Sequence, residues 1–286
     1  MRKRPALSWL LMLLPFLIWL TVFAYAPLVG LMVSFRDFSW NNPLGGKWVG
    51  LRNFHYLFSD SFFDDALLNT LFFAVSKSII IVALPVLLAF ALRSTGKGIS
   101  YLYSSLVMVS YFSSWVVISV AVRFFVSPQT WGLALAGGSL LNQAADARWI
   151  FTFTDSLKSS GWVFFVYLLT LRGLDPAVWE VAFLEGASGP QLLRLVALPM
   201  MAPVIAVVAV LTVTGVVDSS TDQALNLSHP GIYSGVDVIG SYAYRTAIRN
   251  GHIARASAAS LVESALRLAV VAVAFLAGLR FLRRAA

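Results

Sequence analysis

The sequence predicts an all-α integral membrane protein, and two observations lead to this prediction. First, 59% of its 286 residues are hydrophobic and only 12% are charged, with a mean hydropathy of +0.80, whereas about a quarter of the residues of a soluble domain are charged. Second, the apolar residues form long runs rather than short alternating segments, which favours spanning helices over the strands of a barrel. We therefore expect a single transmembrane domain over residues 1–286.

Six hydrophobic segments come near the roughly 20 residues that a spanning helix needs. They lie at about 8–35, 67–92, 101–126, 150–171, 202–217 and 261–282. Asp155 and Lys158 interrupt the fourth segment, and Asp218 and Asp222 directly follow the fifth. The stretches 36–66 and 218–260 are the sizeable loops, and we expect both outside the cytoplasm.

The N-terminus permits two interpretations. Arg2-Lys3-Arg4 before a long apolar run, with Ala24-Tyr25-Ala26 as a cleavage-like sequence, is compatible with a secretory signal. The apolar stretch from Leu7 to Phe35 is too long for a signal core, however, and Pro27 would make a poor cleavage junction. We therefore expect a retained first helix.

The basic residues indicate the orientation and explain the net charge of +8. If the N-terminus is inside, ten Lys and Arg residues lie in the cytoplasmic pieces and eight in the outer ones, and both basic termini share one side. Because basic residues favour the cytoplasmic side, we expect both termini there. These basic residues lie at the ends of apolar runs, where they would contact lipid headgroups. The positive net charge therefore does not indicate a nucleic-acid partner.

Several classes of site are missing from the sequence. It has no cysteine, which excludes disulfides and thiolate metal sites. Gly96-Lys97 lacks the preceding glycine of a phosphate-binding loop, and the histidines His55, His229 and His252 are scattered. We expect no enzyme, no metal and no cofactor bound by this chain.

The loop at 173–200, between the fourth and fifth segments, predicts a hairpin of two short amphipathic helices. Pro176 can begin the first, Val178, Val181 and Leu184 share one face, and Gly186 can end it with a left-handed cap. Such a hairpin favours burial in a groove of a partner. The alternative is a helix that lies at the membrane surface on its own bundle.

The second helix of the hairpin has its own start and stop signals. Ser188 and Gln191 have the spacing of a capping box. The apolar face of this helix is Leu192, Leu195 and Val196. We expect Pro199 to end it before the membrane.

This loop resembles the EAA motif of binding-protein-dependent ABC importer permeases. The motif has Glu-Ala-Ala, a Gly six residues after the Glu, and an aliphatic-x-Leu-Pro ten residues later. The residues in register are Glu180, Ala182, Gly186, Val196, Leu198 and Pro199. Val181 replaces the first Ala, and Glu185 stands where Asp is common.

The resemblance covers nearly the whole chain and favours the polysaccharide, LplB-like branch, near importers of alginate-type chains. Segments similar to sugar-importer permeases in general are Tyr25-Ala26-Pro27, 34–37, 48–54 and Asn69-Thr70. Segments similar to the branch in particular are 111–117, Ser127-Pro128, 222–233 and 237–246.

The resemblance implies a type I ABC importer fold of six spans in the bacterial inner membrane, with a cytoplasmic coupling hairpin. It implies four kinds of partner: a second permease subunit, expected to be a different chain; two ATPase subunits that hold ATP and Mg; an extracytoplasmic solute-binding protein; and the saccharide. The residues that it assigns to ATPase coupling are Glu180, Ala182, Gly186, Ala187, Val196, Leu198 and Pro199.

Polar and aromatic groups at membrane depth are candidates for the substrate pathway, because polar groups there are costly and usually functional. The candidates are Lys77, Tyr111, Trp115, Arg123, Asp218, Asp222 and Arg267. Arg123 and Arg267 have the alternative of snorkelling or pairing with acids such as Glu263, and the aromatic residues that of anchoring at the interface. The sequence leaves the identity, length and charge of the saccharide open.

Two other functions have less support in the sequence. An ion-gradient-driven secondary transporter predicts repeated halves with broken spans at matching positions, which the sequence does not contain. A membrane scaffold without transport has no specific feature in its favour.

Overall fold

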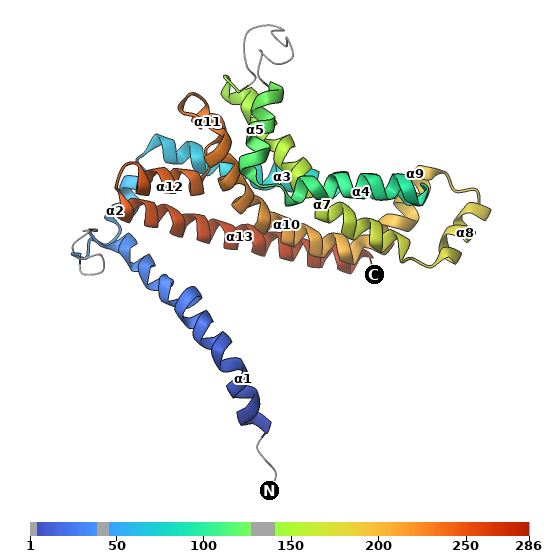
Figure 1. Cartoon of the computed structure of the whole chain (residues 1–286), viewed down its shortest axis with the longest axis horizontal. Coiled ribbons are helices and arrows are strands. Elements are labelled where there is room, and N and C mark those ends of the chain that lie inside the picture. The colour runs from blue at the N-terminus through green and yellow to red at the C-terminus, as the bar shows by residue number, and fades with distance from the viewer. Residues whose placement is uncertain (1–4, 39–45, 127–140, 286) are drawn as a thin grey trace. The chain divides into compact units, whose positions relative to one another are not determined.

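The computed structural model describes residues 5–38, 46–126 and 141–285, and these are nearly all helical (Figure 1). Within them, the only β-pairing is an antiparallel bridge between Arg36 and Trp48. The elements are α1 (Pro5–Leu20), η1 (Thr21–Tyr25), η2 (Ala26–Phe35), α2 (Arg52–Leu57), α3 (Ser61–Leu92), α4 (Lys97–Phe112), α5 (Trp115–Val126), α7 (Ala144–Arg172), α8 (Pro176–Leu184), α9 (Gly189–Gln191), η3 (Leu192–Ala197), α10 (Leu198–Leu227), η4 (Pro230–Ile232), α11 (Tyr233–Val236), α12 (Ile239–Ile248) and α13 (Ile253–Ala285).

The helices confirm the all-α membrane class. Four of the described helical stretches are long and apolar enough to cross a bilayer, and the number rises to six if each of two bent pairs is one span. The predicted count of six spans therefore stays a prediction. The basic residues Arg2, Lys3 and Arg4 and the pair Ser127-Pro128 lie outside the described residues.

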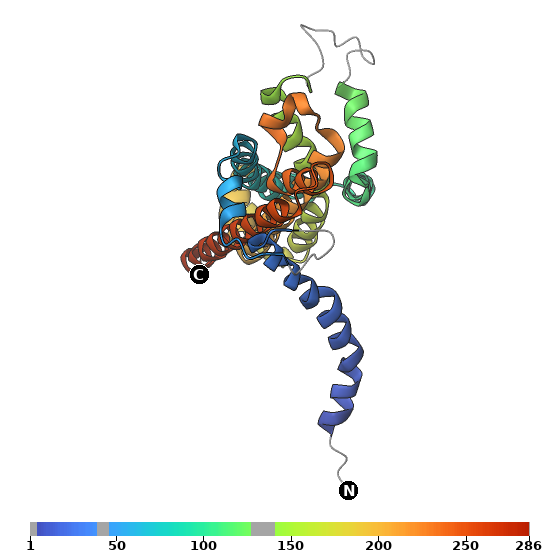
Figure 2. The ribbon, with the colours of Figure 1, turned by 90° about the vertical axis from the view of Figure 1, so that its left-hand side faces the viewer.

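The segment predicted to span at 101–126 is not one straight helix, because α4 and α5 meet at an angle of 107° (Figure 2). The break falls at Ser113 and Ser114. The Ser113 hydroxyl donates to the Val109 carbonyl at 2.7 Å, and the Val117 amide donates to Ser114 Oγ at 3.4 Å. Paired serine side chains compete for backbone groups in this way and bend helices.

The prediction of a loop over 218–260 is wrong. Helix α10 continues to Leu227, and α11, α12 and the start of α13 fill most of the remainder. The apolar run ends at Val217, but the helix does not, because the polar residues that follow find partners inside the bundle. Hydropathy therefore gave the end of the apolar run and not the end of the helix.

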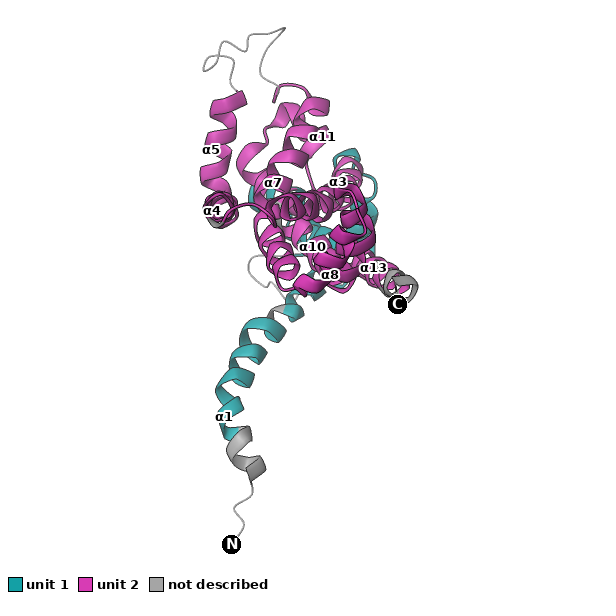
Figure 3. Ribbon diagram, turned by 90° about the vertical axis from the view of Figure 1, so that its right-hand side faces the viewer, with its two compact units in different colours: residues 1–63, 242–264 teal, residues 64–241, 265–286 magenta. Residues whose placement is uncertain are grey.

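The chain divides into two compact units, residues 1–63 with 242–264 and residues 64–241 with 265–286 (Figure 3). Asn53 organises the first unit: its side-chain amide donates to the carbonyls of Ser34 at 2.8 Å and Arg36 at 3.0 Å. The Tyr242 hydroxyl donates to Asp60 at 2.7 Å. Burial, and then this hydrogen bond, raise the pKa of Tyr242 above its ordinary value.

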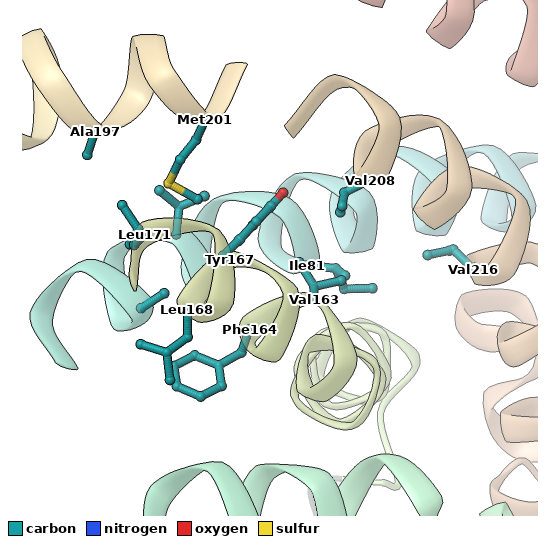
Figure 4. Packing of buried hydrophobic residues seen from close by; sticks show 12 residues of the cluster. Ile81, Val163, Phe164, Tyr167, Leu168, Leu171, Ala197, Met201, Val208 and Val216 are labelled. Atoms are coloured by element: carbon teal, nitrogen blue, oxygen red, sulfur yellow. The ribbon is translucent and has the colours of Figure 1, made fainter. Parts of the chain in front are cut away.

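Helix α7 is the centre of the second unit. Its buried positions recur at helical spacing, among them Phe151, Asp155, Val163 and Tyr167. Figure 4 shows Met201 pointing from α10 toward Leu171 and Tyr167 of α7. The cluster that they belong to also contains Ile81 of α3, so α3, α7 and α10 share one core.

Asn69 and Thr70, at the start of the second apolar segment, hold the 233–239 segment in this unit. Asn69 donates to the Ser234 carbonyl at 3.1 Å and accepts a hydrogen bond from Arg148. Thr70 Oγ1 accepts the Ile239 amide at 3.0 Å. These bonds give a structural reason for the Asn-Thr pair at this position.

Replacement of Gly161 should lower stability. A Cβ there would lie 2.6 Å from the Val107 carbonyl oxygen and 2.9 Å from the Tyr111 Cβ, so Gly161→Ala must push α4 away from α7. We expect a loss of about 1–3 kcal/mol, typical of overpacking, measured as a lower melting temperature of the purified protein in detergent.

Gly215→Ala is the matched control, because a Cβ at Gly215 would meet no atom within 4 Å. Alanine favours a helix by up to about 1 kcal/mol relative to glycine, so this variant should be unchanged or slightly more stable. Equal melting temperatures for the two variants would contradict the close packing of α4 on α7.

Candidate functional site

The predicted hairpin is present at the end of α7, where α8 and α9 project together (Figure 1). Helix α8 begins at Pro176, as predicted, and the Asp175 side chain accepts the Ala177 amide at 2.9 Å. An acidic N-cap followed by proline is a favourable helix start, because both satisfy or remove unpaired amides.

Gly186 ends α8 with the predicted left-handed backbone, at φ +76°. The Ala187 amide donates to the Ala182 carbonyl at 3.1 Å, and the Gly186 amide donates to the Phe183 carbonyl at 3.0 Å. These two bonds form a Schellman motif. The turn of the hairpin is therefore closed by its own backbone.

The second half of the hairpin begins as predicted. The Ser188 amide donates to Gln191 Oε1 at 2.8 Å, which is the glutamine half of a capping box. Of the predicted apolar face, Leu192 is buried, Val196 is half-buried and Leu195 is exposed.

The prediction that Pro199 ends this helix is wrong. The chain passes through a π-turn, η3, directly into α10, with the Leu198 amide donating to the Leu193 carbonyl five residues back. A proline inside an α-helix lacks one hydrogen bond and crowds the carbonyl four residues before it. The wider π-turn just before Pro199 makes room for its ring, so the helix continues.

Apolar side chains of α8 are exposed. Val181, Phe183 and Leu184 are 57%, 59% and 87% exposed, and Glu180 lies on the same exposed helix. Trp179 faces inward, where the Arg93 guanidinium lies 4.5 Å from its ring centroid. The hairpin is thus anchored on one side and presents apolar surface on the other.

A fully buried polar cluster joins α3, α7 and α10. Lys77 Nζ donates to Asp155 Oδ2 at 2.8 Å, to Ser220 Oγ at 2.9 Å and to Gln223 Oε1 at 2.8 Å. Lys77 and Asp155 are both 0% exposed. Gln223 in turn donates to the Phe151 carbonyl. Lys77 is thus held by the bundle and does not line the cavity described next.

A cavity of about 280 Å³ lies beside this cluster. Its polar and aromatic lining is Tyr111, Trp115, Lys158, Ser159, Trp162, Thr212 and Asp222. Lys158 Nζ donates to the Tyr111 carbonyl at 2.9 Å and lies 5.6 and 5.9 Å from the ring centroids of Tyr111 and Trp115. Aromatic faces with one cation, one carboxylate and hydroxyls are suited to a polar ligand with ring-shaped apolar faces.

The other predicted pathway residues lie elsewhere. Arg267 pairs with Asp218 at 2.7 Å, with side chains 32% and 64% exposed. Arg123 donates to the Asn226 carbonyl at 2.8 Å. Of the predicted set, the structure brings Tyr111, Trp115 and Asp222 together in the cavity.

Comparison with known proteins gives relatives along nearly the whole chain, although no family model matches it. The polygalacturonan/rhamnogalacturonan transport system permease protein YteP of Bacillus subtilis is 25% identical over 274 residues, 92% of this chain and 85% of YteP. Protein LplB of the same organism is 24% identical over 281 residues, 92% and 86% of the two chains. The inner membrane ABC transporter permease protein YcjO of Escherichia coli is 26% identical over 279 residues, 92% and 91%.

Solved structures agree with these relatives. Two crystal structures of a bacterial ABC transporter for alginate, one of them in complex with an alginate pentasaccharide-bound periplasmic protein, superpose with TM-scores of 0.84 and 0.83. Each covers 96% of both chains at 28% identity. The chain is a homologue of ABC sugar-importer permeases. The predicted resemblance is confirmed, and an ion-gradient-driven transporter is not favoured.

The homology agrees with the expectation that this permease is not an enzyme, because its relatives are named as permease subunits of transport systems. Its site residues are not named by any of these comparisons. The roles of the hairpin and of the cavity in this permease therefore rest on its own geometry.

Sequence reasoning missed four of the polar and aromatic residues that line the cavity of the permease: Lys158, Ser159, Trp162 and Thr212. Lys158 interrupts the fourth apolar segment and lies in the middle of α7. The spacing of Lys158 and Trp162, four residues apart on one helix, places them on one face. Lys158 also meets the criterion of a charge at membrane depth, so this signal was available in the sequence.

Gly186→Ala should loosen the hairpin of the permease. An L-residue in the left-handed region costs about 1–2 kcal/mol, so we expect amide hydrogen exchange over residues 176–191 to accelerate by roughly fivefold to thirtyfold. Mass spectrometry of the purified permease would measure it.

Gly189→Ala is the matched control in the same turn. Gly189 has no positive φ, and a Cβ there would meet no atom within 4 Å. Its exchange rates should stay as in the wild type, and equal acceleration in both variants would argue against the Schellman cap.

Proposed function

We propose that the chain is the membrane-spanning permease subunit of an ATP-driven importer that moves oligo- or polysaccharide fragments from an extracytoplasmic solute-binding protein into the cytoplasm. The observation that carries this proposal is the α8–α9 hairpin, in a chain homologous to ABC importer permeases. It is internally capped and anchored through Trp179, and it presents Phe183 and Leu184 outward.

The proposed topology is six spans in the bacterial inner membrane with both termini in the cytoplasm, in one transmembrane domain over 1–286. The bent pair α4–α5 would count as one span, and so would α7 with the hairpin at its cytoplasmic end. The relative YcjO is named as an inner membrane protein, which supports the membrane assignment.

In this proposal the hairpin couples the permease to an ATPase. Two ATPase subunits hold ATP and Mg, and this chain binds no cofactor. A second permease subunit completes the pathway. The residues proposed to act in coupling are Glu180, Ala182, Gly186, Ala187, Val196, Leu198 and Pro199. Gly186 and Ala187 close the turn, Pro199 and Leu198 start α10 after the π-turn, and Glu180 lies on the exposed helix.

The cavity is the proposed station for the saccharide in this chain. Tyr111, Trp115 and Trp162 offer aromatic faces for the apolar faces of sugar rings. Asp222 and Thr212 offer side-chain oxygens that can form hydrogen bonds with sugar hydroxyl groups. We further propose that the saccharide carries carboxylates. Lys158 is the cation of this cavity, and relatives are named for polygalacturonan and for the acidic polysaccharide alginate.

Leu184→Glu should detach the ATPase. Burial of a leucine contributes about 1.5–3 kcal/mol, so a charge in its place should weaken association at least about tenfold. Co-purification of the ATPase subunits with the tagged permease would measure it.

Glu185→Gln is the matched control for this experiment, because it alters the neighbouring exposed side chain and removes no apolar surface. It should leave the yield of ATPase unchanged. If Leu184→Glu retains full ATPase recovery and full transport, the hairpin does not couple the permease to the ATPase.

Trp162→Ala should weaken saccharide transport. A stacked aromatic ring contributes about 0.5–1.5 kcal/mol beyond its buried area, so we expect KM for the loaded binding protein or saccharide to rise roughly threefold to tenfold in proteoliposomes.

Phe153→Ala is the matched control: Phe153 lies on the same helix, is 59% exposed and is outside the cavity lining. Its transport should match the wild type. Unchanged kinetics in the Trp162 variant would exclude this cavity as a saccharide station.

A further inference from the structure

Asp155 lies between two lysines that have different roles in the structure. Its Oδ2 accepts Lys77 Nζ at 2.8 Å, and its Oδ1 accepts the Ser159 hydroxyl at 3.1 Å. Lys158 is three residues further along α7, which places it on the same side of the helix as Asp155. The carboxylate therefore has a second cation within reach.

Lys77 is fully satisfied where it lies. An ammonium has three N–H donors, and Lys77 has three acceptors: Asp155, Ser220 and Gln223. Gln223 is held in turn by the Phe151 carbonyl and by Thr154 Oγ1. Lys77 is 0% exposed, so it has neither a free donor nor access to a substrate.

Lys158 lies instead at the cavity. Its ammonium donates to the Tyr111 carbonyl at 2.9 Å and lies over the rings of Tyr111 and Trp115. A main-chain carbonyl and two rings do not neutralise a charge. The carboxylates near its ammonium are Asp222 of the lining and Asp155 on the same helix, and in the cavity the ammonium can also meet an anionic group of a ligand.

The position of Lys158 depends on the charge of Asp155. In a medium of low dielectric constant, an uncompensated carboxylate attracts a nearby cation strongly. If Lys77 were absent, Asp155 would draw the Lys158 ammonium away from Tyr111 and out of the cavity. With Lys77 present, both carboxylate oxygens are already occupied.

We propose that Lys77 is a positioning residue: by neutralising Asp155, it keeps the Lys158 ammonium in the cavity, where it binds carboxylate groups of an acidic saccharide. This inference rests on the proposed function, and it assigns the buried pair an effect on substrate selection in addition to its effect on stability.

The test is the ratio of acidic to neutral oligosaccharide uptake by the complete reconstituted importer. Lys77→Met leaves Asp155 charged and should lower this ratio about tenfold. Lys77→Met with Asp155→Asn removes both charges, so Lys158 should stay in the cavity and the ratio should return to within about twofold of the wild type. A purely structural pair also predicts better assembly of the double variant than of the single one, but it predicts that acidic and neutral uptake fall together, so that the ratio stays as in the wild type.

Two further variants make each outcome decisive. Lys158→Gln should abolish the preference for acidic over neutral oligosaccharides, both alone and combined with the Lys77 and Asp155 substitutions. If the preference persists, the proposed acidic-saccharide function fails. If Lys158→Gln abolishes the preference for acidic oligosaccharides but Lys77→Met leaves it unchanged, the positioning role alone is overturned. Lys77→Gln retains donors without charge and should behave as Lys77→Met. If neither single variant assembles while the double variant does, Lys158 has not compensated Asp155, and the positioning role is also overturned.

A second readout follows the Lys158 amine itself. Its labelling by a water-soluble amine reagent, measured by mass spectrometry on the intact complex, should fall severalfold in Lys77→Met and recover in the double variant. Unchanged labelling in Lys77→Met would overturn the proposal, whatever the transport rates.

Discussion

A buried ammonium in a membrane protein must find all its partners inside the protein, and Lys77 sets this constraint for the second unit. Its three hydrogen bonds reach α7 and α10 from α3, so a shift of any one helix would break an interaction that neither water nor lipid can replace. The apolar core of Ile81, Tyr167 and Met201 packs on the same three helices. Polar and apolar contacts thus fix the same arrangement.

The cavity depends on this arrangement. Helix α7 contributes Asp155 to the buried cluster and Lys158 and Trp162 to the cavity. The orientation of α7 about its axis that buries Asp155 therefore also turns Lys158 and Trp162 toward the cavity. Close approach of α4 at Gly161 brings Tyr111 within reach of Lys158. The lining of the proposed saccharide cavity and the packing of the bundle therefore depend on the same helix.

Much of this could be predicted from the sequence. Hydropathy gave the membrane class, and local backbone rules gave Pro176, the Gly186 cap and the Ser188–Gln191 pair, because all of these depend on residues within one or two turns. The bend at Ser113, the continuation of α10 and the pairing of Lys77 with Asp155 depend on neighbours far along the chain. The sequence identified polar groups at membrane depth, but it could not separate those that satisfy one another from those that face a cavity.

The π-turn at Leu192–Ala197 has a consequence for the register of the hairpin. It holds a residue more than an α-helical turn would over the same length, and each residue of an α-helix turns the chain by about 100°. The direction in which α8 faces, relative to α10, is therefore set by how many residues the turn contains. A deletion of one residue there would point the exposed apolar side chains of α8 toward a different neighbour, with the sequence of both helices unchanged.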